Sequence, residues 1–342
     1  MTSAHPSVTA HAAAKLIIAG EHAVVYLRPA LAVPLPDIAA SVRIDAAPHG
    51  HGCVVHSPDL PQRGQLGVDN DPMLDLIADM LGMWRLPIPD ITVTITSAIP
   101  IASGMGSGAA VATALVRAMA AWYQRTLTPD ELAALVYQSE QRLHGTPSGI
   151  DNTVIAYDRA ISFQRRAPRA DGSPQPPLIA PLAIARPVTL VVGDSGERSP
   201  THLAVAGVRQ RRTQAPAHYD ALFDAIAAVT LVAQQALAHG DIPLLGAICT
   251  QNHALLQAIG VSTPLLDQLV TAACHAGAYG AKLSGAGVGV APRRCTARPH
   301  LSGRRTTVIT TFMPCSWHSL SGIGYNTRCI GIMTYREGLT CV

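Results

Sequence analysis

A glycine-rich stretch at residues 100–110 has residue types suited to binding phosphate. It reads Pro-Ile-Ala-Ser-Gly-Met-Gly-Ser-Gly-Ala-Ala and precedes an alanine-rich segment over residues 111–122. A glycine-rich loop that leads into a helix presents free backbone N–H groups and the positive end of the helix dipole, and both favour phosphate. The stretch lacks the Gly-Lys-Ser/Thr ending of a Walker A loop and does not read Gly-x-Gly-x-x-Gly. It is a candidate triphosphate-binding loop, and an ordinary turn is the alternative.

Two acids, Glu140 and Asp151, lie on either side of a second segment made of turn-forming residues. Residues 144–149 between them read His-Gly-Thr-Pro-Ser-Gly, and proline with glycines forces a tight, irregular turn. The two carboxylates could therefore approach one site from two directions. Beside a phosphate-binding loop they suit Mg²⁺ binding and proton acceptance. The alternatives are that Glu140 is a solvated helix residue and that Asp151 caps the next helix.

A third segment, residues 15–26, begins with a lysine and contains an acid and a histidine. It reads Lys-Leu-Ile-Ile-Ala-Gly-Glu-His-Ala-Val-Val-Tyr. On general grounds Lys15 would extend along the strand and place its ammonium group in solvent. Glu21 and His22, in a turn, would likewise lie on the surface.

A separate group of residues offers metal-ligating side chains. Its members are His49, His51, Cys53 and His56. Their spacing is loose and they lie in a predicted hairpin loop, so a solvated loop is favoured over a metal site.

Short strands and capped helices surround these segments in the first half of the chain. Runs rich in β-branched and aliphatic residues predict strands at residues 15–18, 22–26, 39–44 and 91–96. A capping residue followed by proline predicts helices that begin at Asp71-Pro72 and at Thr128-Pro129. The second start is a Thr-Pro-Asp-Glu capping box, and its helix should end near Arg142.

The second half of the chain has the pattern of an α+β domain. Residues 165–187 are rich in proline, glycine, arginine and serine, which predicts a linker or a long hairpin loop, with the domain boundary near its end. Beyond it we expect strands at residues 189–192 and 308–311, and helices at residues 201–212, 217–239, 242–259 and from Thr263 onwards. A strand, then helices, then a strand suits an α+β fold.

Composition limits the class of protein. Of 342 residues, 48% are hydrophobic and 14% are charged, which predicts a packed chain long enough for two domains. The net charge of +3 is small and no basic stripe occurs, so nucleic acid is not expected as a partner. No uninterrupted apolar run of about 20 residues and no secretory leader are visible. Seven irregularly spaced cysteines indicate free thiols, and together these features predict a cytoplasmic protein without a membrane partner.

The three segments together resemble the three motifs of the GHMP kinase superfamily, and two of them resemble the mevalonate kinases in particular. Residues 20–31 are very close to the N-terminal motif of those enzymes, and residues 144–152 are close to their His-Gly-Asn-Pro-Ser-Gly-Val-Asp-Asn motif. Residues 282–287, Lys-Leu-Ser-Gly-Ala-Gly, look like the start of the third motif. Residues 201–209 resemble the family's substrate-side helix. The resemblance covers residues 10–287, and four ordered matches by chance are improbable.

The resemblance implies a fold and an activity. The fold would be α+β, with an N-terminal domain like domain 2 of ribosomal protein S5 over residues 1–182 and a ferredoxin-like C-terminal domain over residues 183–311. The activity would be transfer of phosphate from ATP, with Mg²⁺, to the C5 hydroxyl of mevalonate, giving 5-phosphomevalonate. Residues 312–342 would form an atypical tail, for which disorder is an open alternative, and a homodimer is a further expectation.

The resemblance also assigns roles to residues. Asp151 would accept the proton of the hydroxyl, Lys15 would orient that hydroxyl, and Glu140 with Ser107 would hold Mg²⁺. ATP would be bound by Pro100, Gly104, Met105, Gly106, Ser107, Gly108, Ala109, Gly285, Ala286 and Gly287. The substrate would be contacted by Glu21, His22, His144, Ser148 and Thr201.

The sequence departs from the family pattern at three places. Mevalonate kinases often have two serines in the loop where this chain has Ser107-Gly108, so one hydroxyl is missing. Val288 interrupts the glycines of the third motif, and it lacks glycine's backbone freedom. Residues 296–342 contain no Asp and no Lys, and our hypothesis is that part of this tail is translated out of the family's frame. Resequencing of the gene would test this.

Two kinds of alternative function remain. One is a sibling GHMP enzyme that acts on phosphomevalonate, on the 3-hydroxyl of mevalonate or on galactose, which residues 144–152 disfavour. The other is a non-catalytic, ATP-binding relative. The presence of Lys15, Glu140 and Asp151 disfavours it.

Overall fold

The computed structural model describes most of the chain and divides it into two compact units. The described residues are 7–58, 63–101, 103–144, 147–194, 201–287, 308–312 and 328–335. Unit 1 comprises residues 1–15, 34–99 and 106–159, and unit 2 comprises residues 16–33, 100–105 and 160–342. Neither unit is continuous in sequence. The predicted boundary near residue 182 therefore stays a prediction about domain organisation.

Unit 1 is built on an antiparallel sheet with one parallel pair. Its strands are β1 (Ser7–Ala19), β2 (Ala30–Ala46), β3 (Cys53–His56), β4 (Arg63–Gln65) and β5 (Ile91–Ser97). Residues 40–46 of β2 pair antiparallel with β5, β5 pairs parallel with β3, and β4 lies at the edge. Ile91, Val93 and Ile95 alternate with more exposed residues, as expected for a strand with one buried face.

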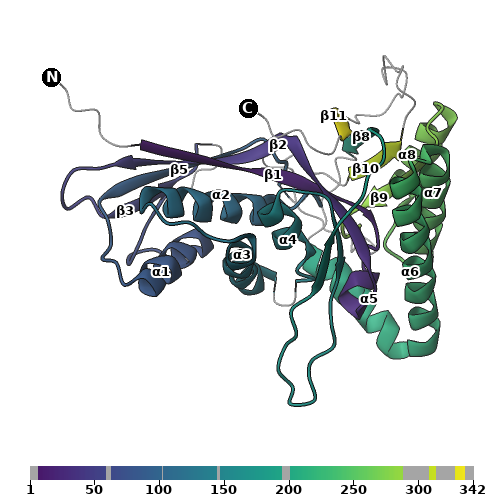
Figure 1. The fold of residues 1–342 in the computed structure, drawn as a ribbon, viewed down its shortest axis with the longest axis horizontal. Helices are drawn as coiled ribbons and strands as arrows, with labels where there is room; N and C mark the ends of the chain where they lie inside the picture. The colour runs from purple at the N-terminus through teal and green to yellow at the C-terminus, as the bar shows by residue number, and fades with distance from the viewer. Residues whose placement is uncertain are drawn as a thin grey trace, which may run out of the picture. The chain divides into compact units, whose positions relative to one another are not determined.

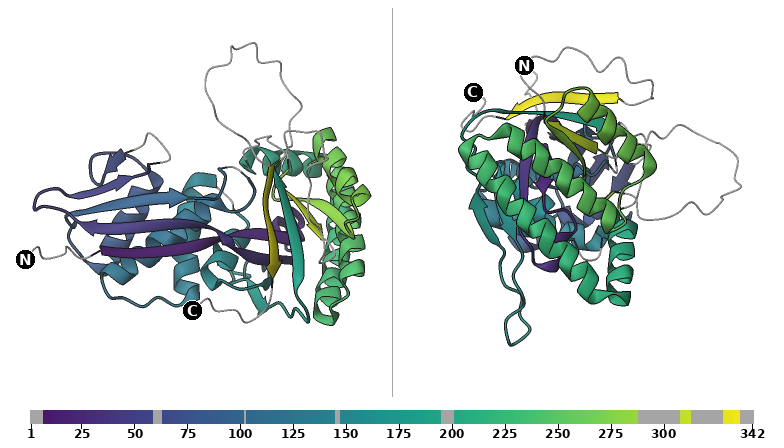
Figure 2. Two further views of the ribbon diagram at one scale, coloured as in Figure 1. Left: turned by 90° about the horizontal axis from the view of Figure 1, so that it is seen from above. Right: turned by 90° about the vertical axis from the view of Figure 1, so that its right-hand side faces the viewer.

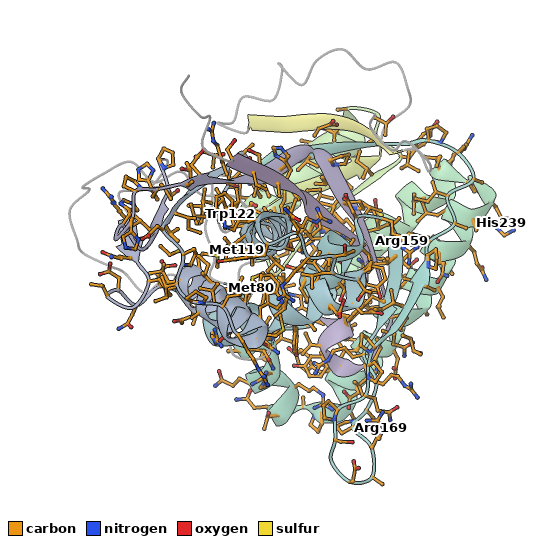
Figure 3. All side chains as sticks on the ribbon, turned by 60° about the vertical axis from the view of Figure 1, so that its left-hand side comes forward. Met80, Met119, Trp122, Arg159, Arg169 and His239 are labelled. Atoms are coloured by element: carbon orange, nitrogen blue, oxygen red, sulfur yellow. The ribbon has the colours of Figure 1, made fainter. Side chains whose placement is uncertain are left out.

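Four helices complete the described part of unit 1. They are α1 (Pro72–Trp84), α2 (Ser107–Trp122), α3 (Pro129–His144) and α4 (Ile150–Tyr157), and Figure 1 shows them on one face of the sheet. Both predicted starts are confirmed: Asp71 accepts a hydrogen bond from Met73 N, and Thr128 and Glu131 form a reciprocal capping box. Met80 and Met119, labelled in Figure 3, are fully buried in the core of this unit.

Unit 2 contains an antiparallel sheet in the order β11-β8-β10-β9. Its strands are β8 (Val188–Asp194), β9 (Gly280–Ser284), β10 (Val308–Phe312) and β11 (Arg328–Tyr335). The strand predicted at residues 308–311 is confirmed as β10, whereas β11 was not predicted. Two further strands are β6 (Ile161–Gln164) and β7 (Leu178–Pro181). Strand β6 pairs antiparallel with residues 30–32 of β2, and β7 pairs antiparallel with β6. Arg169 lies in the loop that joins β6 to β7 (Figure 3).

Helices α5 (Thr201–Gln214), α6 (Pro216–His239), α7 (Ile242–Ala258) and α8 (Pro264–His275) agree closely with the predicted ranges. Helices α6 and α7 run side by side, and α7 and α8 pack against β9 and β10 (Figure 2). Asp241 and Thr263 cap α7 and α8 through their side chains. Gly240 ends α6 in a left-handed conformation.

Helix α6 is long and apolar enough, by length and composition, to cross a membrane. Asp220 and Asp224 interrupt its apolar sequence, so it is not the uninterrupted apolar run of about 20 residues whose absence was noted above. Tyr219, Phe223 and Ile226 of this helix belong to the hydrophobic core of unit 2, together with residues of α7 and α8. We therefore interpret α6 as a core helix, since core helices pass the same test.

The strand predicted at residues 22–26 is wrong, because residues 23–26 form a 3-10 turn, η1 (Ala23–Tyr26). Apolar and β-branched residues gave the strand prediction, but Gly20, His22 and Leu27 all have positive φ angles. Extended backbone requires negative φ, so the chain turns here.

Candidate active site

Lys15 and Asp151 form an ion pair within unit 1. Lys15 lies on β1 and Asp151 in the first turn of α4, with 2.8 Å between Lys15 Nζ and Asp151 Oδ1. The lysine is only 2% exposed, so it does not extend into solvent as general grounds suggested. The side chain of Asp151 is 33% exposed. Gly149 occupies the N-cap position of α4, so Asp151 is not the helix cap. The pair therefore combines a buried cation with a carboxylate that solvent can reach.

Glu140 is the second carboxylate near this pair. It lies on α3 and is 7% exposed, which excludes the alternative of a solvated helix residue. Burial, followed by the charge of Asp151, raises the pKa of Glu140 to about 7, while Lys15 opposes the rise. Two carboxylates thus lie near one lysine. The excess negative charge would favour the binding of a further cation.

The glycine-rich loop approaches both acidic residues through its second half. Gly106 has φ +74°, and a Cβ atom there would lie 3.1 Å from Lys15 Cγ and from Ile155 Cδ1. A Cβ atom on Gly108 would lie 3.1 Å from Glu140 Oε1. Helix α2 begins at Ser107 and carries no side-chain cap, so its first backbone N–H groups are available to an anion. Ala109 continues this first turn and is buried.

Arg117 of α2 fixes the elements that carry the ion pair. Its guanidinium donates to the carbonyl oxygen of His11 on β1 at 2.8 Å and to that of Ile155 on α4 at 3.4 Å. One side chain thus joins the strand of Lys15 to the helix of Asp151. This role has no signal in the sequence, because an arginine on a helix gives no sign of its backbone partners.

The first half of the glycine-rich loop belongs to unit 2 and packs against the third motif. A Cβ atom on Gly104 would lie 3.1 Å from Ser284 O, and one on Gly285 would lie 2.8 Å from Gly104 Cα. Both glycines have positive φ, so the two loops make a backbone contact that side chains would prevent. Met105 between the loop glycines is fully buried. Gly287 is also buried.

Glu21 lies in a second buried polar cluster, within unit 2. It is 1% exposed and forms an ion pair with Lys282 of β9, which is 0% exposed. Asn252 Nδ2 of α7 donates to the other carboxylate oxygen at 3.0 Å. Lys282 Nζ also donates to Ile17 O at 3.2 Å. Neither Lys282 nor Asn252 was assigned a role from the sequence, although a lysine inside the apolar run of β9 is a visible signal.

His22 follows Glu21 in a strained conformation, with φ 61° and ψ −47°. Such a conformation costs about 1–3 kcal/mol in a residue other than glycine. Its Nε2 lies 2.9 Å from Ala286 O, and because a carbonyl oxygen only accepts, Nε2 carries the hydrogen. Burial lowers the pKa of His22 to about 4; the hydrogen bond to Ala286 opposes this shift and Arg211 adds to it. The ring is therefore neutral at physiological pH, with Nδ1 as an acceptor.

For the remaining predicted site residues, the structure describes fewer contacts. Ser148 is partly buried, and its hydroxyl accepts from Ile150 N at 3.3 Å. Pro100 is partly exposed. His144 ends α3 and Thr201 begins α5, but their side chains lie outside the described residues.

The alternative metal site is not supported. His49 Nδ1 lies 3.2 Å from a carboxylate oxygen of Asp90, and His51 contacts Thr92, so these rings do not converge. Cys53 is fully buried. Within the described parts of the chain, no group of three or more His, Cys, Asp or Glu side chains could hold a metal ion.

Comparison with known families gives two matches along the chain. The model of the GHMP kinases N terminal domain matches residues 72–159, and that of the GHMP kinases C terminal matches residues 233–289. A mevalonate kinase of Thermococcus sibiricus is 34% identical over 304 residues, which cover 82% of this chain and 87% of that protein. A mevalonate kinase of Pyrococcus horikoshii is 32% identical over 303 residues, covering 82% and 86%.

Solved structures agree with the family matches. The crystal structure of L. major mevalonate kinase in complex with R-mevalonate aligns with a TM-score of 0.72 at 25% identity, covering 92% of this chain and 89% of that chain. Methanococcus jannaschii mevalonate kinase, at 22% identity and a TM-score of 0.71, supports the fold alone. The expected α+β fold of GHMP kinases is thereby confirmed. From these matches we conclude that this chain is an enzyme of the GHMP kinase family, whose members use ATP.

Proposed function

We propose that this enzyme transfers the γ-phosphate of ATP to the C5 hydroxyl of mevalonate, as a mevalonate kinase. The curated relatives that share 34% and 32% identity over 82% of the chain carry that name. The observation that carries the chemistry is the pair of a buried Lys15 and a reachable Asp151, 2.8 Å apart. A non-catalytic relative would not need this arrangement.

In the proposed mechanism, Asp151 accepts the proton of the attacking hydroxyl. Its carboxylate is the exposed partner of the pair, so a substrate oxygen can approach it. Lys15 Nζ, held 2.8 Å from Asp151 Oδ1, orients the hydroxyl and stabilises the negative charge that develops on its oxygen. Phosphoryl transfer needs little covalent help from the protein, so positioning and charge neutralisation supply most of the acceleration.

Glu140 and Ser107 fit the role of Mg²⁺ ligands. A carboxylate and a hydroxyl are oxygen donors of the kind that Mg²⁺ prefers. The pKa of Glu140, raised to about 7 by burial and by Asp151, indicates a carboxylate that a bound cation would keep ionised. When bound, Mg²⁺ would neutralise charge on the phosphate oxygens of ATP. Gly108 leaves room for the Glu140 carboxylate at the start of α2.

The backbone of the loop from Gly104 to Ala109 is proposed to bind the ATP phosphates. The start of α2 has no side-chain cap, so its first N–H groups suit oxyanions, and the positive φ angles of Gly104 and Gly106 form the turn before it. The nucleotide contacts assigned to Pro100, Met105, Gly285, Ala286 and Gly287 remain predictions.

The substrate contacts assigned to His22, His144, Ser148 and Thr201 remain proposals. His22 offers Nδ1 as an acceptor, and such an atom pairs with a hydroxyl of the substrate better than with its carboxylate. The homodimer and the cytoplasmic location also remain predictions.

An ADP-release assay with four acceptor alcohols tests the function directly. The acceptors are mevalonate, phosphomevalonate, galactose and homoserine, each with ATP and Mg²⁺. We expect mevalonate to give a kcat/KM at least about 100-fold above the others, the discrimination expected from a site with buried polar contacts. Preference for phosphomevalonate or galactose would assign the chain to a sibling activity. No ADP release with any acceptor would favour the non-catalytic alternative.

A further inference from the structure

A sealed polar cluster in unit 2 joins two segments that are far apart in the sequence. Glu21 and Lys282 are 261 positions apart, and both are almost completely buried. One carboxylate oxygen of Glu21 pairs with Lys282, and the other accepts from Asn252. Ser284 Oγ donates to Ile17 O at 3.3 Å beside this pair.

The burial of this cluster bears on what Glu21 can do. The sequence resemblance assigns it to the substrate, yet it is 1% exposed and both of its carboxylate oxygens are engaged by Lys282 and Asn252. A substrate group would have to displace one of these partners and leave a buried charge unpaired, which is strongly unfavourable. The geometry therefore disfavours a direct contact between Glu21 and the substrate.

The cluster lies close in sequence to both ends of the hydrogen bond that holds His22. Glu21 precedes His22 directly, and Lys282 lies on β9, four positions before Ala286, whose carbonyl oxygen accepts from His22 Nε2. The turn that carries His22 is strained, with φ +100° at Gly20 and 61° at His22. Strain of this kind persists only where the surrounding contacts determine the conformation.

We propose that Lys282 and Asn252 are positioning residues which, through Glu21, hold the His22 ring in the orientation that receives the acceptor substrate. This rests on the proposed function, because His22 is a substrate residue only in that function. Asn252 Oδ1 is buried and has no hydrogen-bond partner among the described residues, so Asn252 is placed for its amide donor and not for full satisfaction of its own polar atoms. That cost is consistent with a residue retained to orient Glu21.

The experiment uses the full-length enzyme with Glu21→Gln, Lys282→Met and the double variant. For each we would measure kcat, KM for mevalonate, KM for ATP and unfolding by urea. Either single variant leaves one buried charge unpaired, whereas the double variant replaces both charges with neutral groups of similar size. We expect each single variant to raise KM for mevalonate about 10-fold or more, with kcat and KM for ATP much less affected.

The double variant gives the decisive comparison. We expect its KM for mevalonate and its urea midpoint to be closer to wild type than those of Lys282→Met, since the unpaired charge is gone. If the double variant is as impaired as Glu21→Gln while Lys282→Met has a normal KM, Glu21 contacts the substrate directly and the proposal is wrong. Lower stability with an unchanged KM in all three variants would reduce the cluster to a structural role.

Thr230→Val is the matched control. Thr230 is fully buried on α6 of the same unit, and its hydroxyl donates to Ile226 O. Loss of this hydroxyl should lower the urea midpoint without changing KM for mevalonate. If the wild-type enzyme does not phosphorylate mevalonate, the proposed function fails. The same variants are then compared with whichever acceptor it does phosphorylate, and the urea coupling between Glu21 and Lys282 still tests the cluster.

Discussion

Two lysine–carboxylate pairs in this enzyme have the same chemistry and opposite access to solvent. In unit 1, Lys15 is buried but Asp151 has a side chain that is 33% exposed. In unit 2, both Lys282 and Glu21 are at most 1% exposed. The first pair can meet a substrate without losing its partner, and the second cannot.

The difference in access supports the chemical role proposed for Asp151 and the positioning role proposed for Lys282. A group that accepts a proton during turnover must reach the reacting atom, which the exposed carboxylate of Asp151 allows. A sealed pair contributes through the geometry it imposes, and breaking it is costly because one charge remains buried. Sequence alone does not separate the two, since both lysines lie in apolar strands and both acids follow a glycine within two positions.

The largest expected effect comes from replacing the carboxylate of Asp151 with an amide, and the same replacement at Glu21 serves for comparison. Asp151→Asn should lower kcat by about 10²–10⁴-fold, the usual contribution of a general base, with substrate dissociation constants changed far less. Glu21→Gln is the matched control and should act on KM for mevalonate and on stability. Steady-state kinetics and thermal unfolding of both variants check this. Near-normal turnover of Asp151→Asn would overturn the catalytic assignment.

Much of the fold follows from local signals in the sequence. Capping side chains followed by proline locate the starts of α1, α3 and α8, and alternation locates β5. These signals are read within a few residues of the chain, where backbone bonding and capping are decided. The 3-10 turn at residues 23–26 escaped prediction, because its apolar residues favour a strand and the positive φ of His22 is imposed by distant contacts.

The sequence singles out the candidate site residues but not their partners, and the roles assigned to those residues remain predictions. The approach of Lys15 to Asp151 agrees with the grouping that the motifs indicate. The pairing of Glu21 with Lys282 and Asn252 depends on segments more than 200 positions apart, and no local pattern specifies it. Arg117 likewise acts through carbonyl groups, which every residue has. Such contacts become visible only in three dimensions.

Gly106→Val should give the next largest loss of activity. Gly106 has φ +74°, where a β-branched residue is strained, and its Cβ atom would lie 3.1 Å from Lys15 Cγ. We expect kcat/KM for ATP to fall by roughly 100-fold or more, through displacement of both the loop and Lys15. Gly172→Val is the control, since Gly172 has φ +79° with open space around it. Unchanged ATP kinetics in Gly106→Val would remove the loop from the site.

A pH effect on stability should report on the burial of His22. Burial lowers the pKa of His22 from 6.5 to about 4. Between these values the unfolded chain binds a proton at this ring and the folded protein does not, so stability falls as the pH drops from about 6.5 towards 4 and is fully present above 6.5. At 1.36 kcal/mol per pKa unit the full contribution is on the order of 3 kcal/mol.

His22→Asn isolates this contribution, because asparagine tolerates positive φ and does not titrate. Urea unfolding at several pH values should show a shallower loss of stability towards pH 4 in the variant. His253, whose pKa is also lowered, chiefly by burial, contributes in the same direction in both proteins and cancels in the difference. Parallel pH curves for variant and wild type would show that His22 is not buried as a neutral ring.

The smallest expected effect concerns Ser107, which lies in unit 1 with the accessible Lys15–Asp151 pair. Because Gly108 follows it, Ser107 supplies the only hydroxyl at the first two positions of α2, at the end of the helix that Glu140 approaches. Ser107→Ala should raise the Mg²⁺ concentration for half-maximal activity roughly 10-fold, as loss of one supporting ligand does. Alanine is well tolerated in a helix, so urea unfolding should be nearly unchanged, in contrast with the variants of the sealed pair. Titration of activity with Mg²⁺ at saturating mevalonate gives the measurement. A rise in KM for mevalonate at normal Mg²⁺ dependence would move Ser107 from the metal to the substrate.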